Sequence, residues 1–315
     1  MLLAEHGDLA IHGIAMRPSS PAGMGTVDDH LVFLLPGNPV SCLCAYEFFA
    51  GRAIRVLGGR HCDWPYRDVT LPLRRKLVSA VGRVDYARLA RDPGDLDRYY
   101  QLVAAFSPDS HPDLFPGERD RLTYWINAYN ALVLRAVIDA SPIRGASADF
   151  PAASVMQIPG MFAGREHQIA GERLTLELIE EERIAPFGDP RAHLALGRGA
   201  VGSPRLRSEP FRELELETQL EAVVADFATT PRHFTVDRGA GQVMVSALLG
   251  WRPDRFAAPS GADDSTGRSA LEWGVVSLIA PALFPSERAF LAENTFRFSY
   301  HEFDWRLNDL TGGRP

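Results

Sequence analysis

The chain of 315 residues has little lysine, little cysteine and no long apolar run. Lys76 is the single lysine beside 32 arginines, and the net charge is −7, so no broad basic surface exists to attract nucleic acid or anionic lipid. No apolar run approaches the ~20 residues that cross a bilayer, and Glu5 and Asp8 interrupt any signal-peptide core. We therefore expect a cytoplasmic protein that binds neither nucleic acid nor membrane.

Three cysteines, Cys42, Cys44 and Cys62, are too few for a disulfide framework, and reduced thiols are expected in the cytoplasm. The Cys42–Cys44 spacing is too short for a zinc site, and no two histidines stand four residues apart, so we expect no metal site. Residues 1–80 hold every cysteine and carry a net charge of +1, whereas residues 81–315 carry −8. This asymmetry hints at two joined pieces.

The first sixty residues alternate extended and helical signals. Short apolar runs at residues 11–16 and 31–35 have the composition of buried strands. Asn38-Pro39 has the residue types of a helix start, and the apolar stretch after it ends at Gly58-Gly59. Two further strands are predicted, at residues 69–73 and 76–80. The pattern indicates an α/β segment.

From Asp92 onward the pattern is mostly helical. Apolar residues at helical spacing predict one long amphipathic helix over residues 122–137. Two more helices are predicted, one from Leu174 to a stop at Pro186 and one over residues 211–228. Short strands are predicted at residues 193–196, 234–236, 243–246 and 296–300. This part therefore reads as a helix-rich α+β domain.

The turn Pro36–Ser41 has the composition of an anion site. Gly37 and Asn38 tolerate left-handed backbone angles, and N–H groups at a helix start attract negative charge. An ordinary capped turn is the alternative, since every α/β fold needs such turns.

Three motifs in order, HGIAMRP (residues 12–18), LLPGNPVS (34–41) and SAVGRVDYAR (79–88), resemble molybdopterin molybdenumtransferase, which inserts molybdate into adenylated molybdopterin. The resemblance implies that residues 1–60 are the C-terminal part of a three-layer molybdopterin-binding domain, and that residues 61–91 are a truncated β domain and joint. It implies molybdopterin, with molybdate, as ligand or substrate. The residues that would line the pterin pocket are Arg17, Pro36, Gly37, Asn38, Pro39 and Ser41.

The chain departs from that family in three places. The family's glycine- and serine-rich phosphate loop lies upstream of the matching stretch, Ser20 replaces a second basic residue, and the β-domain motif breaks off near Leu89. We therefore expect an incomplete molybdenumtransferase; any activity would be of that transferase type. A fragment with exposed strand edges needs a partner, either a second copy or a full-length molybdenumtransferase.

The predicted long helix carries two amides, Asn127 and Asn130, near its apolar stripe. Buried amides need hydrogen-bond partners whether or not they serve chemistry, so backbone bonding and a reactive site are both open.

The motifs WINAYNAL (125–132), DPRAHLAL (189–196), SPRLRSEPF (203–211) and FDWRLND (303–309) resemble domain-of-unknown-function family 547 over residues 83–310. With the joint assigned to the first piece, that domain spans residues 92–310. The family usually carries a cysteine where Ser203 stands, which excludes thiol catalysis here. Ser203, His193 and Asn127 are the candidate nucleophile, base and orienting amide of a hydrolase-like module, and a scaffold of structural residues is the alternative. The chain reads as a fusion of the two families.

Overall fold

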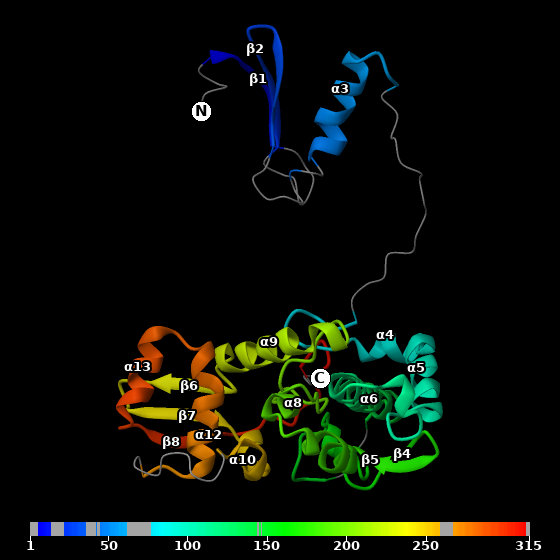
Figure 1. The fold of residues 1–315 in the computed structure, drawn as a ribbon, viewed down its shortest axis with the longest axis vertical. Helices are drawn as coiled ribbons and strands as arrows, with labels where there is room; N and C mark the ends of the chain where they lie inside the picture. The colour runs from blue at the N-terminus through cyan, green and yellow to red at the C-terminus, as the bar shows by residue number, and fades with distance from the viewer. Residues whose placement is uncertain are drawn as a thin grey trace. The chain divides into compact units, whose positions relative to one another are not determined.

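The computed structural model describes residues 6–13, 22–35, 42, 45–61, 77–143, 145, 147–258 and 267–312. The chain divides into two compact units, Met1–Arg74 and Arg75–Pro315. Helices and several small sheets make it a mixed α/β protein (Figure 1). The finer division into residues 1–60, 61–91 and 92–310 stays a prediction.

The first unit contains a three-stranded antiparallel sheet in the order β1 (Asp8–His12), β2 (Gly23–Val27) and β3 (His30–Leu34). Asp28 and Asp29 form the tight turn between β2 and β3, and both have positive φ, as a two-residue hairpin turn requires. A π-helical turn, η1 (Tyr46–Ala50), leads into α3 (Gly51–Leu57). The chain leaves α3 at Gly58-Gly59 as predicted, where Gly59 has φ +70°.

The predicted strand at residues 31–35 is confirmed by β3, and β1 covers the start of the one at residues 11–16. The prediction that both are buried is wrong, because Ile11 and Leu31 are about two-fifths exposed. Short antiparallel strands need only one covered face, unlike the strands of a parallel sheet. The three-layer arrangement inferred for this part stays a prediction.

The second unit is built around α6 (Glu118–Asp139), the predicted long helix, which is confirmed. Trp125, Ile126, Tyr129 and Leu132 on its apolar stripe are almost completely buried. Full burial of each such side chain contributes roughly 1.5–3 kcal/mol. α6 packs against α4 (Tyr86–Arg91), α5 (Gly94–Ala105) and the π-helical turn η4 (Ile179–Ile184).

After α6 the chain forms the hairpin β4 (Glu166–Ile169) and β5 (Glu172–Thr175), and then α7 (Leu176–Leu178) runs into η4. The predicted helix therefore begins two residues later than Leu174, because Thr175 caps it by accepting the N–H of Leu178. Its end near Pro186 is confirmed by the 3₁₀ turn η5 (Ala185–Phe187).

The strand predicted at residues 193–196 is wrong. This part of the chain lies in and just after the short helix α8 (Pro190–Leu194). Asp189 caps the helix by accepting the N–H of Arg191, and proline occupies the first helical position. These start signals determine the local structure and produce a helix in place of the predicted strand.

The remaining strands are confirmed in a second three-stranded sheet, β6 (Phe234–Asp237), β7 (Gln242–Ser246) and β8 (Arg297–His301). β6 pairs with β7 antiparallel and β7 with β8 parallel. The third predicted helix is α9, although it begins at residue 216 rather than 211. The helices here are α9 (Leu216–Thr229), α10 (Leu248–Trp251), α11 (Pro253–Phe256), α12 (Ala270–Ile279) and α13 (Pro285–Glu293).

Among the described residues, no helix combines the length and the apolar character of a membrane span.

The joint motif at residues 79–88 packs within the second unit. The N–H of Val84 donates to the Asn308 carbonyl at 2.9 Å, and the Tyr86 hydroxyl donates to Asn308 Oδ1 at 2.8 Å. Within the described residues 77–80, Val78 makes an isolated bridge to Val84 instead of the continuous strand predicted at residues 76–80. The strand predicted at residues 69–73 lies outside the described residues.

His233 gives the second unit a testable response to acid. Its ring stacks on Phe227 with centroids 4.7 Å apart, and the residue is 1% exposed. Burial, followed by the nearby Arg232 charge, lowers the His233 pKa to about 3.

We predict that His233→Phe makes the protein less sensitive to acid. In the unfolded state the His233 imidazole binds a proton near pH 6.5, whereas in the folded state it stays neutral down to a much lower pH. The free energy of unfolding therefore falls with decreasing pH by up to ~1.4 kcal/mol per pH unit. The variant lacks this site and should flatten the decline between pH 6.5 and 4 in urea unfolding, while His167, with a pKa lowered to about 4, keeps part of the slope. His111→Phe is the control and should retain the wild-type slope. An unchanged slope in His233→Phe would contradict the assignment.

Candidate functional site

A cavity of about 320 Å³ opens in the second unit beside α6, η4 and α8. Charged side chains form one part of its lining and aromatic side chains another. The lining residues are Tyr129, Phe162, Glu177, Glu180, His193, Arg198, Leu248, Trp251, Arg252, Phe256 and Trp305.

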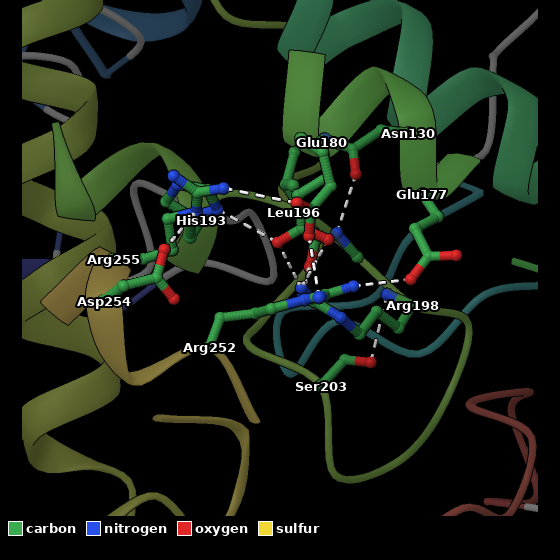
Figure 2. Close-up of polar contacts among 12 residues, drawn as sticks. Asn130, Glu177, Glu180, His193, Leu196, Arg198, Ser203, Arg252, Asp254 and Arg255 are labelled. Atoms are coloured by element: carbon green, nitrogen blue, oxygen red, sulfur yellow. Dashed lines mark hydrogen bonds and ion pairs between the residues drawn. The ribbon is translucent and has the colours of Figure 1, made fainter. Parts of the chain in front are cut away.

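Glu180, His193 and Arg198 form a buried charge cluster in this lining (Figure 2). Nη2 of Arg198 donates to both carboxylate oxygens of Glu180, at 2.8 and 3.0 Å. Nδ1 of His193 lies 3.0 Å from Oε1 of Glu180. The exposed fractions of the three side chains are only 13%, 6% and 9%, in sequence order. The Glu180 carboxylate therefore binds both the Arg198 guanidinium and the His193 imidazole in a buried position.

The charges of the cluster support one another. Burial alone raises the pKa of the Glu180 carboxyl, but the Arg198 charge and the His193 hydrogen bond outweigh it and lower the pKa to about 2. Burial likewise lowers the pKa of the Arg198 guanidinium, yet the Glu180 charge raises it further, so the net shift is upward. Both groups are therefore ionised at neutral pH, and each is the counter-ion of the other.

Arg198 is held by more than its ion pair. Its Nη1 donates to the Leu196 carbonyl at 3.3 Å, and its backbone N–H donates to Ser203 Oγ at 3.1 Å. Asn130 on α6 accepts the N–H of Gly197 at 2.7 Å and donates to the Ala195 carbonyl at 3.0 Å. The backbone of the loop that carries Arg198 is therefore held by Asn130 before residue 198 and by Ser203 at residue 198.

A second, more exposed set of ion pairs includes two residues of the cavity lining, Glu177 and Arg252. Arg252 donates to Glu177 at 2.5 Å and also pairs with Glu181 at 2.9 Å, while Arg255 reaches Glu181 at 3.3 Å. Trp251, next to Arg252, stacks on Trp305 with centroids 5.2 Å apart and rings nearly parallel. The two tryptophans form an aromatic wall.

The structure separates the three residues predicted to act together. His193 bonds to Glu180 and lines the 320 Å³ cavity, whereas Asn127 borders another cavity of about 390 Å³. Ser203 is 4% exposed, and its Oγ accepts the N–H groups of Arg198 and Ala200, at 3.1 and 3.4 Å. No hydrogen bond joins any two of the three within the described part of the chain.

Both amides of α6 bond to backbone, one of the two possibilities that the sequence leaves open. Asn127 donates to the Phe211 carbonyl and accepts the Phe211 N–H, both at 2.9 Å. Asn130 likewise donates to one backbone group, the Ala195 carbonyl, and accepts from another, the Gly197 N–H. The two side chains therefore hold two loops against α6.

Glu180 and Arg198 were not predicted from the sequence. The run of glutamates from 180 to 182 does not show which member is buried: the Glu180 side chain is 13% exposed, whereas that of Glu182, two residues on, is about half exposed. No local signal identifies the pair, because its members are 18 residues apart and the arginine lies on a loop.

The proposed pterin-binding residues Arg17, Pro36, Gly37, Asn38, Pro39 and Ser41 lie outside the described residues. In chain order residues 36–41 follow β3, which ends at Leu34, and precede η1, which begins at Tyr46. Elsewhere, the described side chains contain no group of three or more histidine, cysteine, aspartate or glutamate residues arranged for a metal ion.

Comparison with known proteins confirms both resemblances. Residues 115–228 match the family described as "Protein of unknown function, DUF547". A Methanocaldococcus jannaschii protein, named provisionally for molybdopterin biosynthesis, is 38% identical over 88 residues, which are 28% of this chain and 20% of the relative. Molybdopterin molybdenumtransferases 1 and 2 of Mycobacterium tuberculosis are 38% identical over 97 residues (29% of this chain, 22% of the relative) and 34% identical over 80 residues (25% and 19%).

The chain thus spans about a fifth of the length of these curated relatives. No solved structure matches it. A segment similar to molybdopterin biosynthesis proteins and a DUF547 match occur together in one chain, as in a fusion.

We predict that Ser203→Ala lowers the free energy of unfolding of the second unit by about 1–3 kcal/mol, because two buried N–H groups lose their acceptor. Chemical denaturation followed by circular dichroism measures the change. Ser208→Ala, five residues on and exposed, is the matched control and should change stability by less than about 0.5 kcal/mol. Equal stabilities of the two variants would contradict the role given to Ser203.

Proposed function

We propose that the chain takes part in molybdenum-cofactor biosynthesis and that its first unit contributes to a molybdopterin site. The observation that carries the proposal is the 38% identity over 88 residues to the Methanocaldococcus jannaschii protein named for molybdopterin biosynthesis. The matched length is close to that of the segment in which the three transferase motifs lie, residues 12–88.

The residues assigned to the pterin are Arg17 and the turn Pro36–Ser41. Arg17 would pair with an anionic group of molybdopterin, and the turn would offer backbone N–H groups, as turns before helices do. The place of residues 36–41 in the chain, after β3 and before η1, is consistent with this assignment. Molybdate would enter as the second substrate if the site is catalytic.

The role we propose is that of a cytoplasmic pterin-binding protein acting beside a second copy or a full-length molybdenumtransferase. An assisting role is proposed rather than a complete transferase site because Ser20 stands where the resembling family has a second basic residue. If the protein is itself an enzyme, its reaction is of the molybdenumtransferase type.

Purified protein should bind molybdopterin, and its expression should raise molybdoenzyme activity in a strain with a weakened molybdenumtransferase. Arg17→Ala should weaken pterin binding about tenfold, which corresponds to the loss of one charge-assisted hydrogen bond. Arg60→Ala removes an equal charge from an exposed position of the same unit and serves as the control. Titration of the pterin fluorescence measures the affinity. Absence of binding together with absence of complementation would end the proposal.

A second candidate concerns the domain that matches DUF547, as a scaffold or a hydrolase-like module with Ser203 in the cysteine position. The two N–H groups that bond to Ser203 Oγ favour the scaffold. Hydrolysis of p-nitrophenyl acetate by Ser203→Ala and His193→Ala compares the two: wild-type rates in both variants support the scaffold, and loss of the reaction in both supports the hydrolase.

A further inference from the structure

We propose that the 320 Å³ cavity of the second unit binds a neutral, planar ring compound whose N–H or O–H group donates a hydrogen bond to Nε2 of His193. This site is independent of the pterin site proposed for the first unit. Four features of the cavity carry the inference: its size, its aromatic wall, the fixed orientation of His193 and the pairing of its charges.

The size and the wall favour a flat ring. A volume of about 320 Å³ lies at the lower end of the range for small-molecule sites, which is about 300–1,000 Å³. Trp251 and Trp305 lie nearly parallel to each other, and both line the cavity together with Phe162 and Phe256. Aromatic walls favour planar ligands, since ring pairs add about 0.5–1.5 kcal/mol beyond the burial of area.

His193 supplies the polar group. Glu180 is ionised and lies 3.0 Å from Nδ1, so it holds a proton on that nitrogen and fixes the plane of the ring. In the neutral imidazole Nε2 is then the acceptor. Nε2 has no hydrogen bond to any described residue, and His193 belongs to the cavity lining. A ligand that donates a hydrogen bond satisfies it.

The charges in the lining exclude an ionic ligand. Glu180 is paired with Arg198, and Glu177 with Arg252, so each carboxylate already has its guanidinium. A charged ligand would give up its hydration without gaining an unpaired counter-charge, which is costly in a partly apolar cavity. A neutral ligand avoids that cost.

The larger cavity of about 390 Å³ lacks the same features. Its amides, Asn127 and Asn130, are both engaged with backbone groups, and most of its other lining residues are apolar. Of these two cavities, the one lined by His193 therefore combines the aromatic wall with a histidine nitrogen that can accept a hydrogen bond.

The test compares three probes by isothermal titration calorimetry with the full chain. Indazole is neutral and has an N–H donor, 1-methylindazole has the same rings without the donor, and indazole-3-carboxylate carries a charge. We expect indazole to bind with a Kd of about 1 mM or tighter, and the other two to bind at least about fivefold more weakly.

Two variants locate the binding. His193→Phe should remove the preference for indazole over 1-methylindazole, and Trp251→Ala, at a side chain that is 40% exposed, should weaken both probes. His167→Phe, a change at a buried histidine outside the cavity lining, should leave all three affinities unchanged. The proposal is overturned if indazole does not bind, if the carboxylate binds best, or if neither the His193 nor the Trp251 variant alters binding. Pterin binding by the first unit plays no part in these outcomes.

Discussion

The ion pair between Glu180 and Arg198 is the interaction on which the rest of the second unit's site depends. Two charges buried to this degree are stable only if each serves as the other's counter-ion and the remaining polar atoms find partners. Glu180 meets this condition with His193, and Arg198 meets it with the Leu196 carbonyl. The pair therefore fastens η4 to the loop after α8 and sets the orientation of the histidine at the same time (Figure 2).

The helix α6 supplies the frame for this pair. Asn130 accepts the N–H of Gly197, just before Arg198, and Asn127 accepts the N–H of Phe211 further along the chain. Ser203 stabilises the same loop, because its Oγ accepts hydrogen bonds from two backbone N–H groups of the loop. Of the residues that resembled a catalytic set, Ser203 therefore acts on the loop that carries Arg198, Asn127 holds the chain at Phe211, and His193 lines the cavity beside Glu180.

Sequence patterns predicted the parts of the molecule in which one face or one family motif dominates. α6, with a stripe of Trp125, Ile126 and Tyr129, and the strands β6 to β8 follow from periodicity. A strand was predicted at residues 193–196, whereas the cap at Asp189 and the proline after it start the helix α8 there. Glu180 could not be identified, since only the fold brings its partner from 18 residues away. The burial of β1 and β3 was overestimated because composition does not distinguish a parallel strand from a hairpin.

The central claim, that the buried pair organises the site, is tested most directly by a double-mutant cycle of Glu180→Gln and Arg198→Met followed by urea unfolding. Each single variant leaves one buried group without its counterpart and should lose about 3–5 kcal/mol. The double variant should lose much less than the sum, with a coupling free energy of about 2 kcal/mol or more. Losses that add to within about 0.5 kcal/mol would show that the two side chains act independently and would contradict the account.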